Sequence, residues 1–241
     1  MRVAVCISGL PRGKPGRDIT LNFLNLKRNF PNADFYMGTW KGQESLMQSL
    51  FPNEPVWYFD EPTIDYHPYL DIAEEDTFER IKKPISISRT NEEFRATSSH
   101  QTKQIIAHAL MVDNLPKLYD VIIRARFDTF TSPLATFDPY IKNAYDNKRA
   151  IGFACLKHHW HEFNTAHEIT EPTYTNRFLF DQLIIHSCEI IDTAQIYALS
   201  QERKLLPAEF GWWQILSHNN NHRCVSGWAE HDRSVPAHYL K

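Results

Sequence analysis

The stretch Tyr119-Asp120-Val121-Ile122-Ile123-Arg124-Ala125-Arg126-Phe127-Asp128-Thr129 decides how this chain is interpreted. It begins as an apolar run, typical of a buried strand, and becomes charged at its carboxyl end. Because side chains alternate between the two faces of a strand, Arg124, Arg126 and Asp128 are predicted to share one face. Two guanidinium groups and a carboxylate are costly to bury without partners. This strand end therefore either meets a ligand or forms an internal ion pair that supports a loop.

The ligand interpretation depends on where such a strand ends. In an open α/β sheet, ligands bind outside the carboxyl ends of the strands. A guanidinium group donates two hydrogen bonds at once, which suits a phosphate. The carboxylate of Asp128 offers oxygen, which Mg²⁺ and Mn²⁺ prefer as a ligand. From the strand alone, a phosphate or cation site and a structural Arg–Asp pair both stay open.

The segments around this strand predict an α/β fold. Strands are expected over 3–8, 33–39, 56–59, 150–156 and 223–227, and helices over 18–30, 42–50, 91–115, 184–203 and 208–218. Strands and helices alternate along the first half of the chain, which is the mark of a parallel sheet. Residues 61–89 and 158–175 are rich in polar residues and have no sustained period, so they are predicted to be irregular. We see no linker or repeat and predict one domain over residues 1–241.

The composition limits the possible functions. The chain has 241 residues, of which 42% are hydrophobic and 23% charged, with a formal net charge of −3, so no basic field indicates nucleic acid. No apolar run approaches the length of a membrane span, and the start lacks a secretory signal. The four cysteines form no C-x-x-C pair, and we interpret them as reduced thiols of a cytoplasmic protein.

A glycine-containing loop follows the first strand. Its sequence is Ser8-Gly9-Leu10-Pro11-Arg12-Gly13-Lys14, and such a loop can offer backbone N–H groups to a phosphate. It is not a P-loop, because the glycines are one residue too close and Pro15 stands where a hydroxyl residue is required. Arg12 is predicted at the same sheet edge as Arg126, which favours a ligand over a simple tight turn. Thr39, at the end of the second strand, is predicted to line the same pocket.

Two acidic residues are candidates for proton transfer. Asp181 stands between apolar runs, and desolvation raises the pKa of a carboxyl group, which suits a general base. The alternative is that Asp181 caps the next helix. Glu209 is the second candidate, with a place in the first turn of a helix as its alternative. Arg233, near the C-terminus, either places its guanidinium against a bound diphosphate or lies in a solvated tail.

Together these motifs resemble a family of small glycosyltransferases with a GT-A fold, found in bacterial polysaccharide clusters and in large DNA viruses or phages. The resemblance is carried by Val3–Gly9 with Arg12, Ala33–Trp40, Tyr119–Asp128, Asp181-Gln182 and the segment of Glu209. It implies a Rossmann-type, mostly parallel sheet flanked by helices. It also implies transfer of a sugar from a nucleotide-sugar donor to a hydroxyl of a glycan acceptor, in the cytoplasm of a host cell if the protein is viral.

The resemblance also implies roles for individual residues. Donor binding is expected of Ser8, Gly9, Arg12, Thr39, Arg124, Arg126, Asp128 and Arg233, and catalysis of Asp181 and Glu209. The usual D-x-D metal motif is replaced by Arg126-Phe127-Asp128, so only its last carboxylate is present. Mn²⁺ or Mg²⁺ on Asp128 is therefore in question, and arginines can supply part of the positive charge at a leaving diphosphate. Asp181 is expected to deprotonate the acceptor in a single inverting displacement, whereas retention would need a different arrangement.

Two other functions compete with this one. The segment Ile7–Arg12 resembles the opening of a sulfotransferase phosphosulfate loop, which would bind PAPS. However, Gly13-Lys14-Pro15-Gly16 replaces the hydroxyl residues expected next. The second alternative is a non-catalytic glycan-binding protein of degenerate transferase fold, and the missing first acid of the D-x-D pattern is its main support.

Overall fold

The computed structural model describes residues 1–11, 19–66, 91–129, 131, 137–154, 179, 181–217 and 224–228. Of residues 91–98, 154, 208–209 and 224–228 it describes the backbone alone. The strands are β1 (Val3–Ser8), β2 (Asp34–Trp40), β3 (Val56–Phe59), β4 (Val121–Ala125), β5 (Ala150–Ala154), β6 (Leu183–Ser187) and β7 (Cys224–Trp228). The helices are α1 (Ile19–Asn29), α2 (Glu44–Leu50), α4 (Asn91–Asp113), α5 (Asp138–Asn147), α7 (Thr193–Gln201) and α8 (Ala208–Ser217), with a 3₁₀ turn, η2 (Cys188–Ile190).

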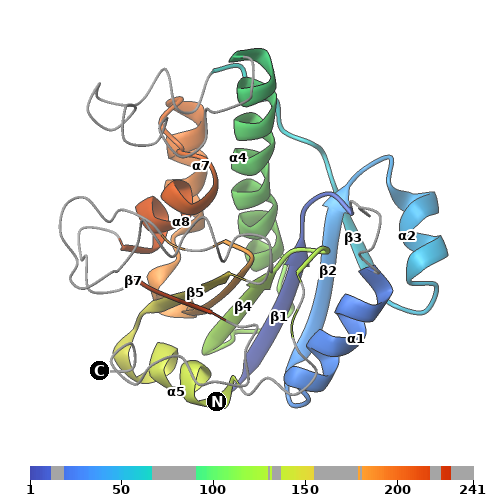
Figure 1. Ribbon diagram of the computed structural model, residues 1–241, viewed down its shortest axis with the longest axis vertical. Helices are drawn as coiled ribbons and strands as arrows, with labels where there is room; N and C mark the ends of the chain where they lie inside the picture. The colour runs from blue at the N-terminus through green and yellow to red at the C-terminus, as the bar shows by residue number, and fades with distance from the viewer. Residues whose placement is uncertain are drawn as a thin grey trace.

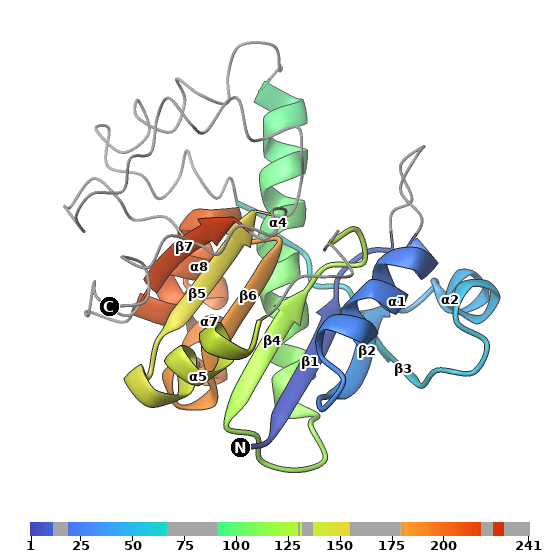
Figure 2. The same ribbon diagram turned by 60° about the horizontal axis from the view of Figure 1, so that its bottom comes forward.

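The described strands form one seven-stranded sheet in the order β3-β2-β1-β4-β6-β5-β7 (Figures 1 and 2). Strand β6 is antiparallel to both β4 and β5, and every other neighbouring pair is parallel. The carboxyl ends of six strands therefore lie at the same edge as the amino end of β6. We call this the carboxyl edge. A mostly parallel sheet flanked by helices confirms the predicted Rossmann-type α/β class.

Helices cover both faces of the sheet. Helices α4, α7 and α8 pack on one face, whereas α1, α2 and α5 pack toward the other (Figure 2). Within β4, Ile123 and Ala125 join the core beneath α1 and α5, while Ile122 packs with Met111 of α4. The predicted alternation of this strand is therefore confirmed. The N-terminal part of α4 extends past the carboxyl edge (Figure 2).

The predicted helix over 184–203 is wrong in its first part. Leu183–Ser187 is strand β6, which is buried along its whole length between β4 and β5. A short apolar run with adjacent isoleucines fits a buried strand as well as a helix, and pairing with two neighbours decides between them. Helix α7 begins only at Thr193, where the side chain of Asp192 accepts a hydrogen bond from the backbone N–H of Gln195 at 3.1 Å. Asp181 precedes strand β6, so the alternative that it caps a helix is also wrong.

Other predictions agree with the described elements. Strand β7 lies at one edge of the sheet, as expected for 223–227. Cys6 and Cys188 are free thiols. None of the described helices is long and apolar enough to cross a membrane. Arg12, Arg233 and most of the two segments predicted to be irregular lie outside the described residues.

Candidate functional site

The candidate site lies where the order of strands reverses. The chain passes from β1 to β2 and β3 on one side, and β4 then pairs with the other side of β1. Such a switch point leaves a crevice at the carboxyl edge, where open α/β sheets bind ligands. Gly9 follows β1 directly, with φ of 111°, in the left-handed region that favours glycine. Arg126 follows β4 directly, so both residues stand at this reversal.

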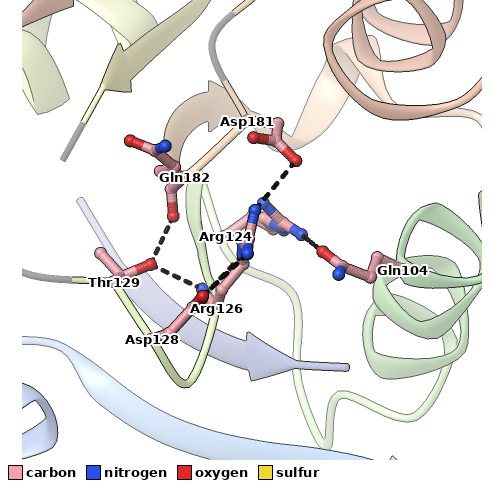
Figure 3. A network of polar contacts seen from close by, with 7 residues as sticks. All are labelled: Gln104, Arg124, Arg126, Asp128, Thr129, Asp181 and Gln182. Atoms are coloured by element: carbon pink, nitrogen blue, oxygen red, sulfur yellow. Dashed lines mark hydrogen bonds and ion pairs between the residues drawn. The ribbon is translucent and has the colours of Figure 1, made fainter. Parts of the chain in front are cut away.

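Arg126 is held between two carboxylates (Figure 3). Its Nε and Nη2 atoms each donate to an oxygen of Asp128 at 2.8 Å, which makes a bidentate pair. Its Nη1 atom lies 3.6 Å from Oδ2 of Asp181. The side chain of Arg126 is 23% exposed and that of Asp128 14%, whereas that of Asp181 is 5% exposed. The charged group therefore reaches the surface on the Arg126–Asp128 side.

A buried threonine joins the two segments that carry these charges. The backbone N–H of Arg126 donates to Oγ1 of Thr129 at 2.9 Å, and that hydroxyl donates to the backbone oxygen of Gln182 at 2.5 Å. The register of β4 and β6, which pairs Ala125 with Leu183, brings the two chain segments together. Thr129 thus fixes the turn after β4 against the residues that precede β6.

Arg124 points away from this surface. It is fully buried, donates from Nη2 to Oε1 of Gln104 at 2.8 Å, and has its guanidinium carbon 4.9 Å from the centre of the Trp212 ring. Arg124 and Arg126 were predicted to meet a ligand together, but a side chain with no exposed surface makes no direct contact with a bound molecule. We therefore replace direct donor binding by Arg124 with a supporting part beneath the edge.

Two buried histidines lie on the same side of the sheet as Arg124. The Nε2 atoms of His108 and His186 are 3.1 Å apart, and Nδ1 of His186 is 3.0 Å from the backbone oxygen of Ser187. Because that carbonyl only accepts, we assign the proton of His186 to Nδ1, so His108 donates to His186 from Nε2. Burial lowers the pKa of His186 to about 4. Burial, His186 and Arg124 together hold the pKa of His108 well below its usual range.

The remaining predicted residues divide into three groups. Ser8 and Thr39 are buried at the carboxyl ends of β1 and β2, and their hydroxyls have no hydrogen-bond partner among the described residues. The backbone of Glu209 lies in the first turn of α8, and its side chain is outside what the structure describes. Arg12 and Arg233 also lie outside the described residues. The structure therefore joins Arg126, Asp128 and Asp181, at the sheet edge where Gly9 follows β1.

Five residues of this region were not predicted from the sequence: Gln104, Thr129, Trp212, His108 and His186. Gln104 precedes Ile105 in α4, and Trp212 lies in the apolar sequence of α8, so each side chain is ordinary within its own helix. Only the packing of α4 and α8 over β4 reveals their contact with Arg124. A threonine directly after a charged strand is a weak signal for Thr129, since threonine hydroxyls often bond to nearby backbone.

The described residues do not fit a divalent cation site. Both oxygens of Asp128 accept from Arg126, and an oxygen of Asp181 faces the same guanidinium. No group of three or more His, Cys, Asp or Glu side chains within the described ranges is arranged to hold a metal. Mn²⁺ or Mg²⁺ on Asp128 would have to displace Arg126, which already stands between the two acids as a cation.

A cavity of about 530 Å³ lies at the other edge of the sheet. Its lining includes Met1, Val3 and Ala33, near the starts of β1 and β2, together with Ile141 and Tyr145 of α5. It is therefore separate from Gly9 and Arg126, which follow the carboxyl ends of their strands. Its mostly apolar lining offers no chemistry related to the charged site.

Comparisons with known proteins give distant structural similarity only. No protein-family model matches the chain, and no curated protein matches it. A similar chain trace occurs in a 4-diphosphocytidyl-2C-methyl-D-erythritol synthase from Anaerococcus prevotii, with 9% identity, 99% of this chain and 93% of that chain covered, and a TM-score of 0.45. Another occurs in the galactosyltransferase LgtC in complex with donor and acceptor sugar analogues, with 8% identity, 94% and 73% covered, and a TM-score of 0.47.

A third similar structure is core-mannan synthase A from Aspergillus fumigatus in a form with Mn and GDP. It has 9% identity, 95% of this chain and 72% of that chain covered, and a TM-score of 0.46. Such identities and TM-scores assign no activity, ligand or metal to this chain. Any function proposed for this chain therefore rests on its own residues.

Proposed function

We propose that this chain is a glycosyltransferase that moves a sugar from a nucleotide-sugar donor to a hydroxyl of a glycan acceptor, with inversion. The observation that carries the proposal is the place of Arg126. Its partly exposed guanidinium lies at the β1/β4 reversal, between Asp128 and the buried Asp181. A fixed cation beside a carboxylate, at the edge where α/β sheets bind ligands, suits a reaction that releases a diphosphate.

The donor is proposed to bind across the reversal. The backbone at Gly9 gives a phosphate close access because no Cβ stands there. The guanidinium of Arg126 faces the diphosphate and stabilises the charge that develops as it leaves. Asp128 keeps that guanidinium in one orientation through the bidentate pair. Arg12 and Arg233 remain predicted donor contacts.

Asp181 is proposed as the general base. Its Oδ2 atom lies 3.6 Å from Nη1 of Arg126, beside the proposed place of the diphosphate. It takes the proton of the acceptor hydroxyl as the new bond forms from the acceptor oxygen to the anomeric carbon. The bond from that carbon to the phosphate oxygen breaks on the opposite side, and the nucleoside diphosphate leaves with the electron pair. Glu209, whose backbone lies in the first turn of α8, stays the alternative base.

A second candidate, a non-catalytic glycan-binding protein, has a specific observation in its favour. Arg126 is already paired with Asp128 and lies beside Asp181, and Arg124 donates to Gln104, so protein groups satisfy much of the charge at this edge. Such a network also serves to hold a loop in place. In that case the ion pairs would support the turn after β4, and no donor would be consumed.

A donor screen tests the proposal. The wild type is incubated with UDP-, GDP- and dTDP-sugars and assayed for hydrolysis and for transfer to glycan acceptors, with binding measured in parallel. Turnover of one donor that is lost in Asp181→Asn is the expected result. The matched control is Asp146→Asn, which removes a carboxylate from an exposed pair at the other edge of the sheet. Glycan binding without turnover of any donor would favour the lectin-like alternative, and a thermal shift with PAPS alone would favour a sulfotransferase.

A further inference from the structure

Gln104 connects the buried Arg124 with the loop that follows β1. It lies on α4, is partly exposed, and accepts a hydrogen bond from Nη2 of Arg124 at 2.8 Å. On its other side, its Cγ and Cδ atoms would lie 3.4 Å and 3.8 Å from a Cβ atom placed on Gly9. The Gln104 side chain therefore packs directly against the backbone of the β1/β4 reversal.

The chemistry of arginine decides which way the Gln104 amide faces. A guanidinium group only donates hydrogen bonds, so the amide must present its oxygen, and not its nitrogen, to Arg124. Its Nε2 group, with two N–H donors, is then turned away from Arg124 (Figure 3). Gln104 makes no hydrogen bond through Nε2 to any described residue. A donor of fixed orientation is thus present beside Gly9.

Arg124 is itself held rigidly. It has no exposed surface, and its guanidinium lies over the Trp212 ring at 4.9 Å from the ring centre. Stacking on an aromatic ring and donation in a fixed plane are properties that lysine does not share. Buried arginine at this position therefore sets the orientation of the amide without touching a ligand.

We propose that Gln104 donates a hydrogen bond from Nε2 to a diphosphate oxygen of the bound nucleotide, and that Arg124 is the positioning residue that keeps this donor facing the ligand. The inference rests on the proposed function, because it takes a nucleoside diphosphate as the ligand. It adds a neutral donor to a site in which Asp128 and Asp181 both lie beside the guanidinium of Arg126.

Binding of UDP, GDP and dTDP to the full chain, measured by calorimetry, tests the proposal. Gln104→Glu keeps an oxygen facing Arg124, and so keeps the buried guanidinium paired, but removes the N–H donor and places a negative charge beside the diphosphate. A hydrogen bond to a charged group is strong enough that affinity for the bound nucleotide should fall roughly 10- to 100-fold or more. Gln201→Glu adds the same charge at an exposed site at the end of α7 and should leave binding unchanged.

Kinetics provide a second readout. Gln104→Glu should raise the KM for the nucleotide-sugar while the KM for the acceptor stays the same, which loss of folding would not produce. Arg124→Lys should shift the donor KM in the same direction, since the amide loses its fixed partner.

The possible outcomes separate the two proposals. If the wild type binds a nucleotide and Gln104→Glu binds it with the same affinity, the role of Gln104 is overturned and the proposed function stands. Failure of the folded wild type to bind any of the three nucleotides would overturn the proposed function itself.

Discussion

The hydroxyl of Thr129 lies 2.5 Å from the backbone oxygen of Gln182, although the two residues are 53 positions apart in the chain. The same oxygen atom of Thr129 accepts from the backbone N–H of Arg126. This one side chain therefore sets the distance between the two segments that carry Arg126 and Asp181. Loss of this hydroxyl should therefore affect both segments.

Thr129→Val should destabilise the fold and lower activity together. Valine has a similar shape but leaves the Arg126 N–H and the Gln182 oxygen without their shared partner in a buried place. The free energy of unfolding should fall by about 1–3 kcal/mol, measured with urea. Thr20→Val, at a partly exposed position of α1, is the matched control and should change it by less than about 0.5 kcal/mol. Unfolding curves that coincide for Thr129→Val and the wild type would show that the bridge has no role.

Asp128→Asn should weaken use of the nucleotide-sugar. An amide cannot accept two charge-assisted hydrogen bonds from Arg126, so the guanidinium loses its fixed orientation. We expect a higher donor KM, with the acceptor KM unchanged, in steady-state assays at varied donor concentration. A lower donor KM would mean instead that Asp128 competes with the diphosphate for Arg126, and would contradict the supporting part given to this acid.

Asp181→Asn should abolish turnover and leave donor binding nearly intact. Loss of a general base costs roughly 10²- to 10⁴-fold in rate, whereas the amide keeps the size of the side chain. The measurements are kcat with the active donor and the Kd of the same nucleotide by calorimetry. An equal loss of rate and binding in a folded variant would remove Asp181 from the role of base and direct attention to Glu209.

Removal of divalent cations should leave turnover largely unchanged. Arg126 already stands as a cation between Asp128 and Asp181. The assay compares rates after extensive dialysis against EDTA with rates after addition of Mn²⁺ or Mg²⁺. Strong loss of activity that Mn²⁺ restores would show that the site rearranges to admit a metal, and would contradict the part given to Arg126.

Stability should fall as the pH is lowered from about 6.5 toward 4. Burial lowers the pKa of His186 from its ordinary 6.5 to about 4, and that of His108 is also well below its usual range. Between these values the unfolded chain binds protons that the folded chain does not, so acid favours unfolding. Each histidine contributes up to about 1.4 kcal/mol per pH unit.

Urea unfolding at pH 7, 6 and 5 measures this slope before most carboxylates titrate. His186→Gln removes one of the two titrating groups, so the dependence on pH should be shallower in that variant. A slope in His186→Gln as steep as in the wild type would show that the buried pair does not control acid stability.

Much of the fold could be predicted from local patterns. The strands at Val3–Ser8 and Val56–Phe59 were predicted with the observed bounds, because glycine and proline residues stand beside both runs, Gly9 and Pro11 after the first and Pro55 before the second. The long α4 was also predicted, since Pro116 follows it. The error at Leu183–Ser187 has a physical cause, because an apolar run of this length satisfies a buried strand and a buried helix equally.

The candidate site could be predicted only in part. A charged strand end and a glycine loop indicated that Arg126, Asp128 and Gly9 share an edge. The partners of Arg124 could not be predicted, because Gln104 and Trp212 come from two different helices whose packing depends on the whole core.

The sequence by itself determined that residues 121–125 form a strand with a charged end, because the alternation of side chains is a local property of extended backbone. Only the tertiary structure decided that β6 runs against β4, pairing Ala125 with Leu183. That reversed pairing places Asp181 beside Arg126, and it depends on hydrogen bonds between segments far apart in the chain, which no local pattern specifies. The tertiary structure also buries Arg124, because α4 and α8 pack over the face of β4 on which this side chain lies.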